Sequence, residues 1–183
     1  MDTITLEEEA SGLDLLVLKL VGILSRHVPY VIVSTYVAVL LGYTKAIEEV
    51  DMLLGKLSKE QFIVLLRELL AEGFWCINGE SEEELFALLS ENVAIRLAEK
   101  DTVVPHFKLA LAKDAFDELA ITEKMKVLLP QGEMYIAPIP RQIAYNQVVS
   151  KHLEDALYLQ QKFAIPEEEI ERQKKILKEY GRV

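Results

Sequence analysis

The fold is indicated most strongly by residues 30–53, which read YVIVSTYVAVLLGYTKAIEEVDML. The first four residues are aromatic or β-branched, which favours a short buried strand. Ser34 and Thr35 then form a small-residue turn, and an apolar segment from Tyr36 to Leu41 predicts a short helix. Gly42 is suited to end that helix, because glycine adopts the left-handed conformation common after a helix C-terminus. A strand, a tight turn and a short helix are therefore expected in succession.

Two carboxylates stand where the next strand begins, in the tripeptide Glu49-Val50-Asp51. The strand is predicted over residues 50–54, and side chains at i and i+2 of a strand share a face, so Glu49 and Asp51 should project together. Adjacent carboxylates repel each other unless a cation such as Mg²⁺ lies between them. Together with a nearby helix N-terminus that can bind phosphate, the pair suits phosphoryl or nucleotidyl transfer. A solvated strand start is the alternative interpretation.

The remaining apolar segments predict a mixed sheet followed by helices. Ser11, Ser58 and Ser81 are expected N-caps, the first for a helix that ends before Pro29. Further helices are expected at residues 59–71, 82–90 and 114–120, and strands at 74–77, 94–98, 103–112, 124–129 and 134–136. Three helical segments close the chain, at 141–149, 153–163 and 167–180. The order predicts the α+β class, with a domain over residues 1–137 and a helical C-terminal extension over 138–183 packed on it.

Composition limits the class of protein. Apolar residues make up 51% of the 183, which is enough for a buried core. The net charge of -10 opposes a broad nucleic-acid-binding surface. No apolar run reaches the roughly 18 residues of a membrane span, and the acidic start differs from a signal peptide, so we expect a cytoplasmic protein. The single cysteine, Cys76, excludes an intrachain disulfide and is expected to be a core thiol.

Residues 30–156 resemble the DNA polymerase β-type nucleotidyltransferases, especially their small archaeal and abortive-infection-related members. The pattern of that family is a strand, Gly-Gly or Gly-Ser, a short helix, a Gly-Tyr-x-Arg-x-Thr-like connection and Asp-apolar-Asp. Ser34-Thr35 fall on the glycine pair, Lys45 on the arginine, and Glu49 and Asp51 on the aspartates. The resemblance continues further along the chain. His106-Phe107-Lys108 is similar to the start of the family strand that carries the third carboxylate, and Pro138 to Tyr145 and Lys151 to Ala156 are similar to two C-terminal stretches of the family.

This resemblance implies a polymerase β-like mixed sheet flanked by helices, and transfer of a nucleoside monophosphate from a nucleoside triphosphate to a hydroxyl acceptor. The residues that it implies for Mg²⁺ are Glu49 and Asp51. The residues that it implies for the nucleotide are Ser34, Thr35, Lys45 and Lys108. His106 would replace the third carboxylate as the base, although a structural histidine is the alternative for it, and solvated side chains are the alternative for the two lysines.

The departures from the family pattern bear on activity. Ser34 replaces a glycine that lets the backbone approach phosphates, and His106 is a poor ligand for Mg²⁺. Pro140, Asn146 and His152 also replace the usual Glu, Lys and Asp. Two functions therefore stay open: an active Mg²⁺-dependent nucleotidyltransferase, or a catalytically degenerate relative that binds a nucleotide or a protein partner. A third hypothesis is a pure interaction protein, such as an antitoxin-like partner.

Two smaller expectations concern the segment before the second C-terminal helix. His152 is expected to be an ordinary surface or helix-end residue. Lys151 and Asp155 are four residues apart, which predicts an ion pair on the helix surface.

Overall fold

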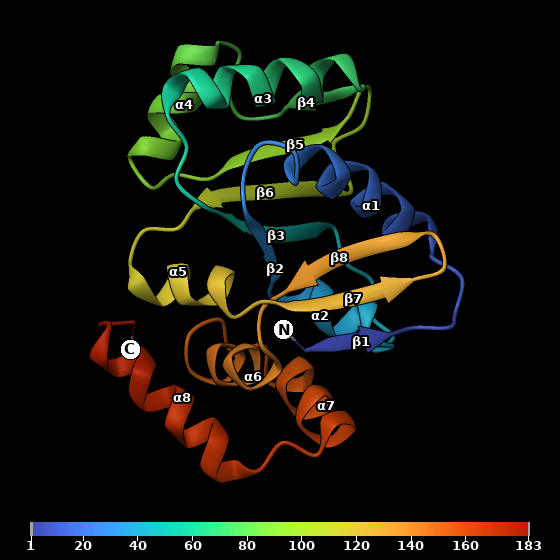
Figure 1. The fold of residues 1–183 in the computed structure, drawn as a ribbon, viewed down its shortest axis with the longest axis vertical. Helices are drawn as coiled ribbons and strands as arrows, with labels where there is room; N and C mark the ends of the chain where they lie inside the picture. The colour runs from blue at the N-terminus through green and yellow to red at the C-terminus, as the bar shows by residue number, and fades with distance from the viewer. Residues whose placement is uncertain (1, 183) are drawn as a thin grey trace.

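The computed structural model describes residues 2–182, which form an α+β fold around one mixed sheet of eight strands (Figure 1). The strands are β1 (Thr3–Thr5), β2 (Tyr30–Val33), β3 (Glu49–Leu54), β4 (Phe74–Cys76), β5 (Ile95–Glu99), β6 (His106–Leu111), β7 (Met125–Leu129) and β8 (Gly132–Ile136). Their order across the sheet is β1-β7-β8-β2-β3-β6-β5-β4. The predicted α+β class and mixed sheet are confirmed.

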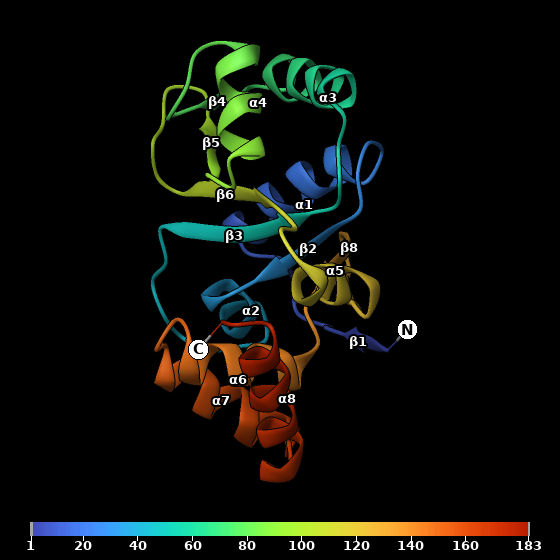
Figure 2. The same cartoon turned by 90° about the vertical axis from the view of Figure 1, so that its left-hand side faces the viewer.

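Eight helices flank the sheet within residues 2–182: α1 (Gly12–Leu24), α2 (Thr35–Leu40), α3 (Lys59–Ala71), α4 (Glu82–Ser90), α5 (Ala115–Thr122), α6 (Ile139–Val148), α7 (Leu153–Phe163) and α8 (Glu167–Glu179). Figures 1 and 2 show α3 and α4 at one end of the molecule and α6, α7 and α8 at the other. None of the helices in this described part is long and apolar enough to cross a membrane.

Serine caps fix the starts of three helices, as the sequence predicts. Ser11, Ser58 and Ser81 each accept a hydrogen bond from the backbone N–H three residues further on. The caps at Ser11 and Ser58 are complete capping boxes. The cap at Ser81 is not a complete capping box, because the carboxylate of Glu84 accepts a hydrogen bond from the backbone N–H of Glu80 and not from the backbone N–H of Ser81.

Alternate side chains of the strand β3 point to opposite faces of the sheet. Val50, Met52 and Leu54 are at most 1% exposed and belong to the main core, which also contains residues of α1, α3 and α4. The alternate residues Glu49, Asp51 and Leu53 face the other side. Leu53 there packs against a small second core of Val31, Ala120 and Ala137, which includes a residue of α5. The carboxylate pair therefore lies on the sheet face that α5 partly covers.

The strand β1 is absent from the sequence prediction, which assigns no element to the acidic N-terminal residues. It pairs in parallel with β7, with Thr3 opposite Lys126. A three-residue edge strand is too short to show a period-two pattern, so only its tertiary pairing defines it.

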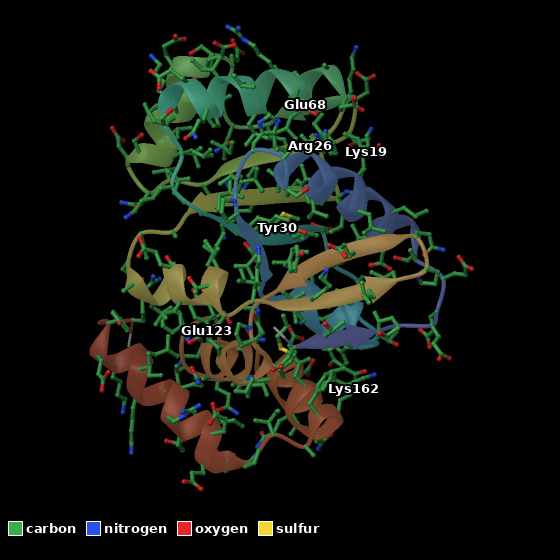
Figure 3. The ribbon with its side chains drawn as sticks, viewed as in Figure 1. Lys19, Arg26, Tyr30, Glu68, Glu123 and Lys162 are labelled. Atoms are coloured by element: carbon green, nitrogen blue, oxygen red, sulfur yellow. The ribbon has the colours of Figure 1, made fainter. Side chains whose placement is uncertain are left out.

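Charged side chains join helices that are far apart in the sequence. Arg26, which follows α1, donates to Glu68 of α3, and Figure 3 labels both residues between these helices. At the other end, Arg141 of α6 donates to Glu123 at the end of α5 with a distance of 2.8 Å. Glu123 is labelled in Figure 3 near the C-terminal helices. The pair of Arg141 and Glu123 thus links α6 to α5, the helix that partly covers the carboxylate-bearing face of the sheet.

Candidate functional site

A cleft with a volume of about 440 Å³ lies between the carboxylate-bearing sheet face, α5 and α6. This volume is in the range of small-molecule sites. Its lining includes four basic residues, Lys108, Lys113, Arg141 and Arg182, and three acidic ones, Glu49, Asp51 and Asp117. Its apolar lining includes Val33, Leu53, Ala110, Leu111, Phe116 and Ala120. The cleft thus combines a charged part with an apolar part.

Strand register brings the charged residues of the cleft together. The strands β3 and β6 are parallel, and Glu49 pairs with His106 while Asp51 pairs with Lys108. The Lys108 Nζ lies 3.1 Å from Asp51 Oδ1 and 3.7 Å from Glu49 Oε1. A lysine ammonium is therefore within ion-pair distance of both carboxylates.

Glu49 has further cationic neighbours. His106 Nε2 donates to Glu49 Oε2 at 2.8 Å, and Arg96 Nε lies 3.6 Å from the same oxygen. Partial burial raises the pKa of Glu49, but the His106 hydrogen bond and the charges of Lys108 and Arg96 outweigh it, so the pKa falls below its ordinary value. His106 contacts Glu49, yet it lies outside the set of described residues that line the cleft.

The donor set of this face suits Mg²⁺ poorly. Mg²⁺ requires oxygen ligands in an octahedron, whereas Lys108 contacts both carboxylates here and His106 and Arg96 also contact Glu49. Burial lowers the pKa of Lys108, but Asp51 and Glu49 outweigh that effect and raise it, so the lysine keeps its charge. Among residues 2–182, no group of three or more His, Cys, Asp or Glu side chains is arranged to hold a metal ion.

Ser34 has a backbone conformation that is normally reserved for glycine. Its φ is 68° and its ψ is -153°, a region that costs a residue with a side chain about 1–3 kcal/mol. Ser34 is 8% exposed and lines the cleft between β2 and α2. The chain therefore keeps a glycine-type turn at the position where the family pattern has glycine, although the residue is serine.

Thr35 and Lys45 contact a residue of α7. The Thr35 hydroxyl donates to Asp155 Oδ2 at 2.8 Å, and Lys45 Nζ donates to Asp155 Oδ1 at 3.0 Å. Asp155 has no solvent exposure, and neither Thr35 nor Lys45 is among the described residues lining the cleft. The expected surface pair of Asp155 with Lys151 is wrong, because Lys151 has a φ of 61° and precedes the helix that carries Asp155.

Several residues that line the cleft are not predicted as site residues from the sequence. His152 is the N-cap residue of α7, as a helix-end residue should be, but it also lines the cleft. Arg182 pairs with Asp114 and Asp117 of the α5 region at 2.7 and 2.8 Å. Tyr145 of α6 also lines the cleft, and burial raises the pKa of its hydroxyl. Only tertiary packing brings these residues together, since they lie in separate segments of the sequence.

The strand face thus presents carboxylates paired with basic side chains, next to a glycine-type turn and an apolar recess. No protein-family model matches the chain, and a search of curated proteins gives no match either. The class of protein has to be inferred from the geometry of this cleft and from the topology around it.

Proposed function

We propose that the chain is a catalytically degenerate protein of the polymerase β-type nucleotidyltransferase fold, which binds a nucleotide in its cleft without a divalent metal. The family pattern supports the fold part of the proposal. The strand β2, the Ser34 turn and α2 are followed by β3, which runs antiparallel to β2, and then β6 lies parallel to β3. This arrangement puts Glu49, Asp51 and His106 on neighbouring strands in the order that the resemblance assigns to the three carboxylates.

The position of Lys108 is the observation that carries the functional part. Its ammonium lies 3.1 Å from Asp51 and 3.7 Å from Glu49, so the protein itself supplies a cation to both carboxylates. An ammonium that is already paired in this way neutralises the repulsion that would otherwise favour a divalent ion. His106 adds a donor where a two-metal site needs a third oxygen ligand.

The lining of the cleft indicates the class of ligand. Lys108, Arg141 and Arg182 are each paired with carboxylates, whereas Lys113 has no ion pair among the described residues, so Lys113 is the lining side chain that can attract a phosphate group locally despite the overall net charge of -10. The apolar recess beside Leu53, Ala110 and Phe116 can accommodate a flat, weakly polar ring system. A nucleotide has both of these parts, and a volume of about 440 Å³ is of a suitable size for it.

Thermal melting with ATP, GTP, CTP and UTP, each in EDTA and in Mg²⁺, tests the proposal. We expect at least one nucleotide to raise the melting temperature in EDTA, because binding to the native state alone stabilises it. The rise should be lost in Lys108→Met and kept in Lys56→Met, which removes a lysine that is 84% exposed. No shift with any nucleotide in either condition would refute nucleotide binding.

Metal-dependent nucleotidyl transfer is the second candidate, favoured by the fact that Glu49 and Asp51 both line the cleft. It predicts that the protein transfers label from an α-³²P nucleoside triphosphate to protein or RNA in Mg²⁺ or Mn²⁺. If the protein is catalytically degenerate, as we propose, no label is transferred. Transfer that disappears in Asp51→Ala would therefore establish the second candidate and overturn the first.

A further inference from the structure

A buried acid on α7 contacts the first residue of α2 and a residue of the loop that follows α2. Asp155 is fully buried and accepts hydrogen bonds from the Thr35 hydroxyl and the Lys45 ammonium, one on each carboxylate oxygen. A carboxylate removed from water is stable only when it is paired and hydrogen-bonded. These two contacts therefore fix Thr35 and Lys45 relative to α7.

Thr35 directly follows the strained residue of the cleft turn. Ser34 makes no side-chain capping bond, and α2 contains only six residues, so local interactions do little to hold its left-handed φ of 68°. The bond from Thr35 to Asp155 constrains the residue next to the turn from outside the segment. Strained backbone of this kind persists only where surrounding contacts over-determine it.

The same hydroxyl also orients His152. Thr35 Oγ1 has a single proton, which it donates to Asp155, so it can only accept from His152 Nδ1 at 3.0 Å. In the neutral ring the proton is therefore on Nδ1, and the Nε2 lone pair stays free. Because His152 lines the cleft, Asp155 influences the cleft through the turn and through the tautomer of this histidine.

We propose that Asp155 is a positioning residue of the cleft. By binding Thr35 it holds the Ser34 turn in its glycine-type conformation and leaves His152 Nε2 free for a ligand, so that ligand binding depends on α7. The ligand named here rests on the proposed function, whereas the coupling between Asp155, the turn and the histidine can be measured without a ligand.

A double-mutant cycle in thermal melting tests the coupling to the turn. Asp155→Asn should lower the melting temperature, and the loss should be larger in a Ser34→Gly background, because the strained serine turn can relax and recover part of its strain once the Asp155 contact is lost, whereas a glycine turn has no strain to recover. Ser58→Ala removes the α3 cap at the other end of the molecule, so its loss should be the same in both backgrounds. Equal losses for Asp155→Asn in the two backgrounds would overturn the inference.

Thr35→Val provides the same comparison if Asp155→Asn does not fold, because it removes the hydroxyl and leaves the pair between Lys45 and Asp155 intact. It also tests the histidine. ¹⁵N NMR of the neutral ring should show the proton of His152 on Nδ1 in the wild type and a shift towards the Nε2–H tautomer in Thr35→Val. A wild-type ring protonated on Nε2 would contradict the proposal.

Nucleotide affinity links the cluster to the cleft. Titration in EDTA with whichever of ATP, GTP, CTP and UTP stabilises the wild type most should show about tenfold weaker binding to Thr35→Val, while Lys56→Met binds like the wild type. Unchanged affinity of Thr35→Val would refute a positioning role. If the wild type binds no nucleotide, the proposed function fails, and the melting cycle and the NMR result still decide whether Asp155 controls the turn and the histidine.

Discussion

At the scale of single residues, Ser34 combines a glycine-type backbone with a side chain. Ser34→Gly should therefore stabilise the protein by about 1 kcal/mol, because relief of about 1–3 kcal/mol of strain exceeds the extra entropy that glycine loses on folding. Urea unfolding measures the change. Ser25→Gly is the matched control, since Ser25 has an ordinary helical φ of -60° and the substitution should destabilise. A loss of stability in Ser34→Gly would show that the turn is not strained.

Glu49 should make stability depend on pH. Burial raises the pKa of Glu49, but the hydrogen bond from His106 and the charges of Lys108 and Arg96 outweigh that effect. The folded-state pKa of Glu49 therefore lies below its ordinary value. Ionised Glu49 therefore stabilises the fold above the unfolded pKa of about 4.3, and this contribution disappears as the pH falls through the folded-state pKa. The difference in unfolding free energy between wild type and Glu49→Gln should shrink as the pH falls below about 4.3. A difference that grows on acidification would contradict the ion pairs described for Glu49.

At the scale of elements, much of the fold can be predicted from local signals. The helices α3 and α7 begin and end where the sequence indicates, because α3 has a capping box and both helices have a clear apolar periodicity. The strands β2 and β3 follow from β-branched and alternating residues. The strand β1 is missed, since three partly exposed residues carry no periodic pattern and depend on β7 for their pairing.

The junction between α2 and α7 provides an element-scale prediction. A Cβ on Gly42 would lie 3.0 Å from the Tyr158 hydroxyl and 3.3 Å from Lys162 Nζ, and the residue has a φ of 102°. Gly42→Ala should therefore destabilise by about 1–3 kcal/mol, measured by urea unfolding. Gly22→Ala in α1 is the control, because nothing lies within 4 Å of its Cβ position and alanine favours a helix by about 1 kcal/mol. Equal effects of the two substitutions would argue against the described contact of Gly42 with α7.

At the scale of the whole molecule, the sequence places part of the cleft. The i, i+2 spacing puts Glu49 and Asp51 on one face, and both line the cleft. The partners of these carboxylates could not be predicted, because Arg96 and Lys108 reach them through strand pairing between β5, β6 and β3. The burial of Asp155 and the position of His152 beside the cleft depend on how α7 packs on α2, which no local pattern encodes.

We propose that Lys108 supplies the positive charge that a divalent metal supplies in an active nucleotidyltransferase. Calorimetric titration tests it most directly, with the nucleotide that stabilises the protein most, in EDTA and then in excess Mg²⁺. The account predicts similar Kd values in the two conditions and a Kd about tenfold or more weaker for Lys108→Met in EDTA. Binding that requires Mg²⁺, is abolished by EDTA and is lost in Asp51→Asn would contradict it.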